Sequence, residues 1–302
     1  MPTETKTFGS EHNSISISSE PSAAGNLVHH LRKKRRGISK DLQMPDAIIT
    51  VVIKDRNNFQ LDESPQFQGE PNPSEIRKFL AEKIYSSVRF QVSGTVSIST
   101  VISLLGMLRT KEISLSYQRA FNQRPMSVDE LNLLQNFLKK DGRIETLELP
   151  EHNIGDVAAI GLISAIRANN SMGREGARDS ILHELNLSNN NLSAEFVTDL
   201  EADENAGIVR VLDSLDLSNN HISRVGIEAL AKILSPERSG IKTLTFSKNR
   251  HAGAISLNPL FEALRHNRQL EYLEVAQNEI GLHDNVQLYA FLRENSTLAT
   301  LD

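Results

Sequence analysis

Apolar residues recur at a regular interval in the second half of the chain. Within each interval they occupy positions 1, 4, 6 and 11, and an asparagine occupies position 9. The units that follow this pattern begin at Ile144, Leu182, Leu212, Ile241 and Leu270. The first has His152 in the asparagine position and the fourth has His251 in the last apolar position, while the other three fit throughout. With a sixth start at Leu298, the spacings are 38, 30, 29, 29 and 28 residues, which indicates a structural repeat.

Each unit is predicted to form a short strand, a turn and a helix. Leucines at positions 4 and 6 lie on one face of a strand and would point into a core. Where the chain turns away at position 9, an asparagine amide provides both a donor and an acceptor for buried backbone groups. Helical spacing follows, as at Val225, Ile227, Leu230, Ile233 and Leu234. One unit cannot bury its own apolar face, so we expect the units to stack.

Two segments carry a resemblance to a known family. Leu-Asn-Leu-Ser-Asn-Asn-Asn-Leu at 185–192 and Leu-Asp-Leu-Ser-Asn-Asn-His-Ile at 215–222 resemble leucine-rich repeats of the ribonuclease-inhibitor type. The resemblance covers residues 141–302 and implies an α/β fold, a right-handed solenoid or horseshoe with parallel strands on its concave face and helices on its convex face. Residues 298–302 begin a further unit and stop, so we expect a repeat domain that is truncated at its C-terminus.

The remaining chain is expected to form two regions. Residues 1–45 are rich in Ser and Asn and poor in large apolar groups, which predicts a disordered tail with a basic run at 32–36. Residues 46–140 form a flanking region, either degenerate strand–helix repeats or a cap of another topology. Its expected strands lie at 48–53, around Phe90 and Val92, and around Ile113 and Leu115; its expected helices lie at 74–86, 98–108 and 127–140. Residues 169–176 are expected to be an insertion within the first repeat interval.

Charge is divided unevenly along the chain. Residues 1–45 contain seven Lys and Arg against four Asp and Glu, so of the net charge of −5 the tail contributes +3 and residues 46–302 contribute −8. A folded part with this balance should favour a basic or mixed-charge partner over nucleic acid. The chain has no cysteine, which excludes disulfides, thiolate metal sites and cysteine nucleophiles. No run of about 20 apolar residues could span a bilayer, and we expect a cytoplasmic protein, or a nuclear one if the run at 32–36 acts as an import signal.

The strand positions between the leucines are expected to face the concave surface and to bind a protein partner there. The candidate binding residues are Glu145, Glu148, Glu151, Glu184, Asn186, Asp213, Asp216, Lys248, Tyr272 and Glu274. Strands lie ~4.8 Å apart, so the position between the two leucines, from Glu148 to Asp302, would form a mainly acidic column roughly 25 Å long. One interpretation is a docking surface for a Lys- and Arg-rich segment, and the other is a solvated polar face without preference.

Catalytic and metal-binding patterns are missing from the sequence. It has no phosphate-binding glycine loop, no Gly-x-Ser-x-Gly and no His-Glu-x-x-His, so we expect a binding protein without enzyme activity or cofactor. The four histidines of the repeat region occupy different repeat positions and should not converge on a metal ion. They are His152, His183, His221 and His251.

Three further hypotheses remain open. Activators of the Ran GTPase share this repeat type and use an arginine near the strand-to-helix loops; Arg224 and Arg250 lie in such loops, so a GTPase regulator is one alternative, by likeness of fold alone. Effectors secreted by intracellular bacteria often join a disordered N-terminus to such repeats, which would place the protein in a host cytosol. The basic tail could also fold back onto the acidic surface and compete with partners.

Overall fold

The computed structural model describes residues 4–9, 14–21, 47–55, 84–94, 98–119, 125–170, 182–236, 238–249, 256–278 and 284–302. The chain divides into two compact units. The first consists of Met1–Gln123 with Arg143–Glu145, and the second of Arg124–Gly142 with Thr146–Asp302. Each unit is described by itself.

The first unit is a sheet of five strands with a helix. Its elements are β1 (Glu4–Gly9), β2 (Ser14–Pro21), β3 (Ala47–Asp55), β4 (Ile84–Gly94), α3 (Ile98–Leu105) and β5 (Arg109–Arg119). Strands β1, β2 and β3 pair antiparallel, whereas β3, β4 and β5 pair parallel. Phe90, Val101 and Leu115 are fully buried in its core. Arg143 donates hydrogen bonds to the carbonyl groups of Leu105 and Leu108 at the end of α3.

Two features of this unit differ from the sequence-based expectation. Strands β1 and β2 lie in the segment that was expected to be disordered. The reason is visible in Ser-Ile-Ser-Ile at 14–17, a period-two pattern that composition alone does not register. Residues 84–86, expected to end a helix, begin strand β4 instead. The basic run at 32–36 and the rest of that expected helix, 74–83, lie outside the described residues.

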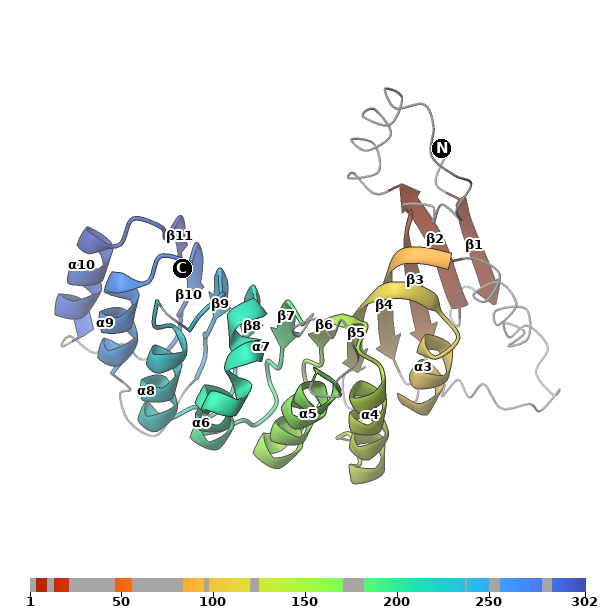
Figure 1. The fold of residues 1–302 in the computed structure, drawn as a ribbon, viewed down its shortest axis with the longest axis horizontal. Coiled ribbons are helices and arrows are strands. Elements are labelled where there is room, and N and C mark those ends of the chain that lie inside the picture. The colour runs from red at the N-terminus through yellow and green to blue at the C-terminus, as the bar shows by residue number, and fades with distance from the viewer. Residues whose placement is uncertain are drawn as a thin grey trace, which may run out of the picture. The chain divides into compact units, whose positions relative to one another are not determined.

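The second unit alternates strands and helices along its whole length. Its elements are α4 (Val128–Lys140), β6 (Ile144–Glu148), α5 (Gly155–Asn170), β7 (Glu184–Asn186), α6 (Ala194–Glu201), the 3-10 helix η1 (Asp203–Asn205), α7 (Ala206–Val211), β8 (Ser214–Asp216), α8 (Arg224–Ile233), β9 (Thr243–Thr245), α9 (Asn258–His266), β10 (Tyr272–Glu274), α10 (Asp284–Glu294) and β11 (Thr300–Leu301). Within this unit the strands lie on one side and the helices on the other (Figure 1).

The leucines of successive strands stack in one row, as the repeat predicted. Parallel pairing sets Leu147 beside Leu185, then Leu215, Leu244, Leu273 and Leu301. The first five are buried at 2% exposure or less. Parallel strands joined through helices are right-handed in nearly all proteins. The expected α/β solenoid is confirmed.

Buried asparagines form a ladder beside the leucine row. They occupy position 9 and are Asn190, Asn220, Asn249 and Asn278. The amide of Asn220 donates to the carbonyl groups of Leu187 (3.0 Å) and Leu217 (3.0 Å), and its oxygen accepts from the backbone N–H of Asn190 (2.9 Å) and Leu192 (3.0 Å). The ladder therefore satisfies backbone groups where the chain leaves each strand, which confirms the role predicted for these residues.

Candidate partner-binding surface

The outward-facing positions of strands β6 to β10, together with the residues just after them, form a surface that we call the strand face. Its central row is the acidic column, defined as Glu148, Asn186, Asp216, Thr245 and Glu274. Strand pairing brings these five residues side by side, one from each strand. Because their neighbours in sequence are buried apolar residues, strand alternation points the column toward solvent.

Asp216 lies at the centre of the acidic column and is partly buried. Burial raises the pKa of its carboxyl group. Hydrogen bonds from the backbone N–H (2.9 Å) and hydroxyl of Ser218 oppose this rise in pKa, and the carboxylates of Glu274 and Glu148 add to it. The charged groups of the column therefore interact across several strands, and Asp216 is ionised at a cost in folding free energy.

Neutralising Asp216 should stabilise the protein. A carboxyl whose folded pKa is raised binds its proton more tightly in the folded state, so ionisation above that pKa favours unfolding. Asn186 occupies the same position one strand away and accepts the same hydrogen bond from Ser188 (2.9 Å), so Asp216→Asn keeps the local geometry. We expect the free energy of unfolding at pH 7 to rise by a few tenths to about 1 kcal/mol. Urea unfolding should show the gain shrinking as the pH falls toward 4, and a loss of stability at pH 7 would contradict it.

A shallow hollow of about 320 Å³ opens on this face and is called the strand-face hollow. It is lined by Glu151, Ser188, Asn189, Asp216, Ser218, Asn219, Thr245, Ser247, Lys248 and Glu274. The hydroxyl of Ser247 donates to Glu274 (2.9 Å), and its backbone N–H donates to the hydroxyl of Ser218 (3.2 Å). Asp216 and Glu274 thus flank a floor of hydroxyl groups formed by Thr245 on β9 together with Ser218 and Ser247.

The other candidate residues of the strand face have local partners. Glu184 accepts from the hydroxyl of Thr146 (3.3 Å), and the hydroxyl of Tyr272 donates to Glu274 (3.4 Å). Partial burial and the nearby carboxylates of Glu274 and Asp302 raise the pKa of Tyr272. Glu145 belongs to the first unit.

Asp213 is the best compensated of the candidate carboxylates. Its oxygens contact Nδ1 of His183 (3.0 Å) and Nζ of Lys242 (2.6 Å). The hydrogen bond and charge of Asp213, and to a lesser extent the charge of Glu271, raise the pKa of Lys242. Lys242 therefore offsets the charge of Asp213. In the described part of the chain, no Lys or Arg forms an ion pair with the carboxylates of the acidic column.

A second hollow, of about 340 Å³, lies among the loops that follow the strands and is called the loop hollow. Asn219, Asn220, His221, Lys248 and Gln277 line it. Asn219, Lys248 and Gln277 have positive φ angles of 53°, 61° and 59°. The equivalent residues Glu151 and Asn189 also have positive φ angles, of 64° and 56°. The sequence analysis named Lys248 as a candidate binding residue but not His221 or Gln277. One residue in each of these loops has a left-handed backbone conformation, and in only two of the five units is that residue an asparagine, the type that signals this conformation in a sequence.

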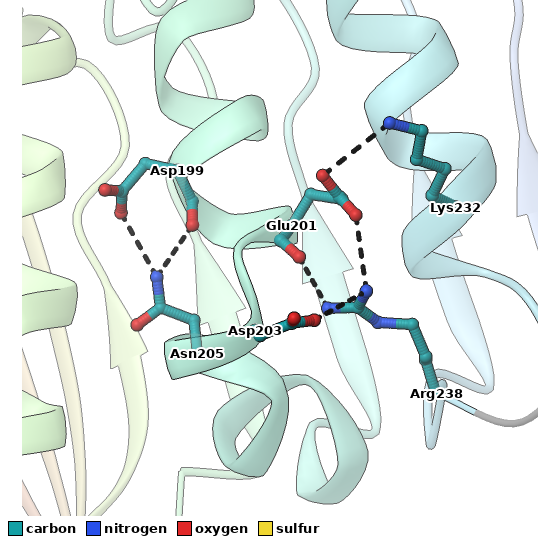
Figure 2. Close-up of polar contacts among 6 residues, drawn as sticks. All are labelled: Asp199, Glu201, Asp203, Asn205, Lys232 and Arg238. Carbon is teal, nitrogen blue, oxygen red and sulfur yellow. Dashed lines mark hydrogen bonds and ion pairs between the residues drawn. The ribbon is translucent and has the colours of Figure 1, made fainter.

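A polar cluster on the helix side joins η1 and α7 to their neighbours (Figure 2). Arg238 donates to the side chain (3.3 Å) and the carbonyl oxygen (2.5 Å) of Glu201 at the end of α6 and contacts Asp203 (3.3 Å). Lys232 lies 3.9 Å from the other oxygen of Glu201. The amide of the buried Asn205 donates to both the carbonyl oxygen (2.7 Å) and the carboxylate (3.2 Å) of Asp199. These contacts connect the segment between α6 and α7 to α8 and the residues that follow it. The cluster therefore has a structural role.

The residues considered for other chemistry lie apart. Arg224 is exposed and pairs with Glu228 (3.0 Å) within α8, while Arg250 and His251 lie outside the described residues. His152 is buried in the ladder, and His183 pairs with Asp213. In the described part of the chain, no three His, Asp or Glu side chains group as a metal ion would require. Among the helices that the structure describes, none has the length and apolar character needed to cross a membrane.

Comparison with known proteins agrees with the repeat geometry. A leucine-rich-repeat family model matches residues 182–202, from the strand β7 through α6, and a second one matches residues 210–231, which include β8 and most of α8. No curated protein matches the chain. The two matches fall on two of the three units that fit the pattern throughout. Together with the stacked strands, they identify leucine-rich repeats at residues 182–202 and 210–231.

Proposed function

We propose that the protein is an interaction scaffold whose strand face binds a basic or mixed-charge segment of another protein. Proteins built from leucine-rich repeats are generally scaffolds for protein–protein interaction. The observation that carries the proposal is the alignment of Glu148, Asp216 and Glu274 in one row of the parallel strands, facing solvent. The spacing of 28 to 30 residues in the later units, with a helix in each, supports a repeat of the ribonuclease-inhibitor type.

Electrostatics favours a cationic partner. Burial raises the pKa of Asp216, and the carboxylates of Glu274 and Glu148 add to the rise, so a bound Lys or Arg side chain would stabilise the ionised carboxylate of Asp216. The hydroxyl floor of the strand-face hollow adds acceptors for an ammonium or guanidinium group. Complementary charge of this kind raises association rates and selects among partners. The alternative of a GTPase regulator gains no support from Arg224, because this exposed arginine forms an ion pair with Glu228 in its own helix.

Selection from a random dodecapeptide display library tests the proposal. Peptides retained by the wild-type protein should be enriched in Lys and Arg. The triple variant Glu148→Gln, Asp216→Asn and Glu274→Gln should lose this enrichment and bind the selected peptides at least about tenfold more weakly, since three charge interactions are removed. The amide replacements are close in size to the carboxylates, so the stacked strands should remain intact.

A helix-face triple variant provides the matched control. Glu195→Gln, Glu228→Gln and Glu262→Gln remove the same charge from exposed positions of α6, α8 and α9. This control should select the same basic peptides as the wild type. Equal loss of binding in both triple variants would reduce the effect to net charge and would contradict a specific site on the strand face.

A further inference from the structure

The inference rests on the proposed function and narrows its ligand. We propose that the partner segment carries a basic and an acidic residue two or three positions apart. Its Lys or Arg side chain binds in the strand-face hollow between Asp216 and Glu274, and its Asp or Glu carboxylate binds Lys248 in the adjoining loop hollow. The two hollows share Asn219 and Lys248 along their common border.

The strand-face hollow fits one basic side chain. Asp216 and Glu274 stand on strands that flank β9, about 9.6 Å apart at the backbone, with Thr245 between them. Their carboxylates converge on the same hollow. Asp216 accepts hydrogen bonds from the backbone N–H (2.9 Å) and the hydroxyl of Ser218, and Glu274 accepts from the hydroxyl groups of Ser247 (2.9 Å) and Tyr272 (3.4 Å). A carboxylate has about four acceptor positions. Acceptors therefore remain on both sides for an ammonium or guanidinium group.

The loop hollow has the opposite character. Among the described residues that line it, none is a carboxylate and Lys248 carries a positive charge. An anionic group suits such a site. Lys248 lies three positions after Thr245, which is at most ~10 Å of chain. An extended peptide covers that distance in three residues, or in two when its charged side chains are long. The basic and acidic residues of the ligand are therefore expected two or three positions apart.

The display selection tests this pairing when three proteins are compared. They are the wild type, Lys248→Asn, and Asp216→Asn with Glu274→Gln. Asparagine occupies the equivalent left-handed position as Asn189 and Asn219, so Lys248→Asn removes the charge while suiting the backbone. Lys139→Gln, an exposed charge removal at the end of α4, is the matched control.

The wild type and Lys139→Gln should enrich peptides with Lys or Arg two or three residues from Asp or Glu. Lys248→Asn should keep the basic preference and lose the acidic one, and the Asp216 and Glu274 variant should lose the basic one. In calorimetric titration of a selected peptide, Lys248→Asn should weaken binding about two- to fivefold, and only when the acidic residue of the peptide is present.

Each remaining outcome decides a different point. A wild-type pool enriched in basic residues alone, or an acidic preference that persists in Lys248→Asn, would overturn the charge pairing and leave the proposed function standing. A wild-type pool without basic enrichment would overturn the proposed function itself.

Discussion

Replacement of Asn220 with alanine should lower the free energy of unfolding by about 3–5 kcal/mol. The amide of Asn220 is 2% exposed and bonds backbone groups of two neighbouring repeats. Alanine would leave the N–H groups of Asn190 and Leu192 and the carbonyl group of Leu187 buried without these bonds. Each buried polar group that loses its partner costs about 1–3 kcal/mol.

Urea unfolding followed by circular dichroism measures this loss. Asn136→Ala is the matched control, because Asn136 is exposed on α4 and its replacement should change stability by no more than about 0.5 kcal/mol. A change below 1 kcal/mol for Asn220→Ala would mean that water or a shifted backbone replaces the ladder, and the structural role given to position 9 would be wrong.

A methyl group at Gly240 should destabilise the protein by about 2–3 kcal/mol. Gly240 lies in the loop before β9, where its N–H donates to the carbonyl of Val209 (3.3 Å). A Cβ atom there would overlap the carbonyl oxygen of Arg210 and lie 2.9 Å from its carbonyl carbon. Both are backbone atoms near the end of α7, so the overlap can be relieved only by moving two segments apart.

Gly207→Ala is the matched control for Gly240→Ala. Gly207 lies in α7, is exposed, and has no atom within 4 Å of an added Cβ. Alanine there should be neutral or stabilise by up to about 1 kcal/mol, because it favours the helical backbone. Equal thermal unfolding temperatures for the two alanine variants would show that the loop before β9 does not approach α7 as closely as described.

The periodic part of the fold could be predicted from the sequence because each unit repeats the same physical solution. Leu185, Leu215 and Leu273 mark the strands, and their register follows once the spacing is known. The asparagine ladder was equally predictable, since a turn beside a buried strand needs both donors and acceptors. The capping box of Ser127 and Glu130 likewise marks the start of α4.

Features that depend on contacts between neighbouring repeats could not be predicted from the sequence. The pairing of Asp213 with both His183 and Lys242 requires the register of three strands, so the sequence showed three charges but not their mutual compensation. The break that separates α6 from α7 depends on Arg238, thirty-seven positions from Glu201. The loop hollow depends on left-handed residues whose side chains are chemically unrelated.

Hydrogen–deuterium exchange, with and without a peptide selected by the wild-type protein, locates the bound segment on the protein. Binding to the strand face should slow exchange in 146–151, 184–189, 214–219, 243–248 and 272–277, which form that surface. Helices α5, α6, α8 and α9 should exchange unchanged, and the strand-face triple variant should show no protection. Protection confined to the helices would place the binding site on the opposite side of the repeats and would rule out the strand face.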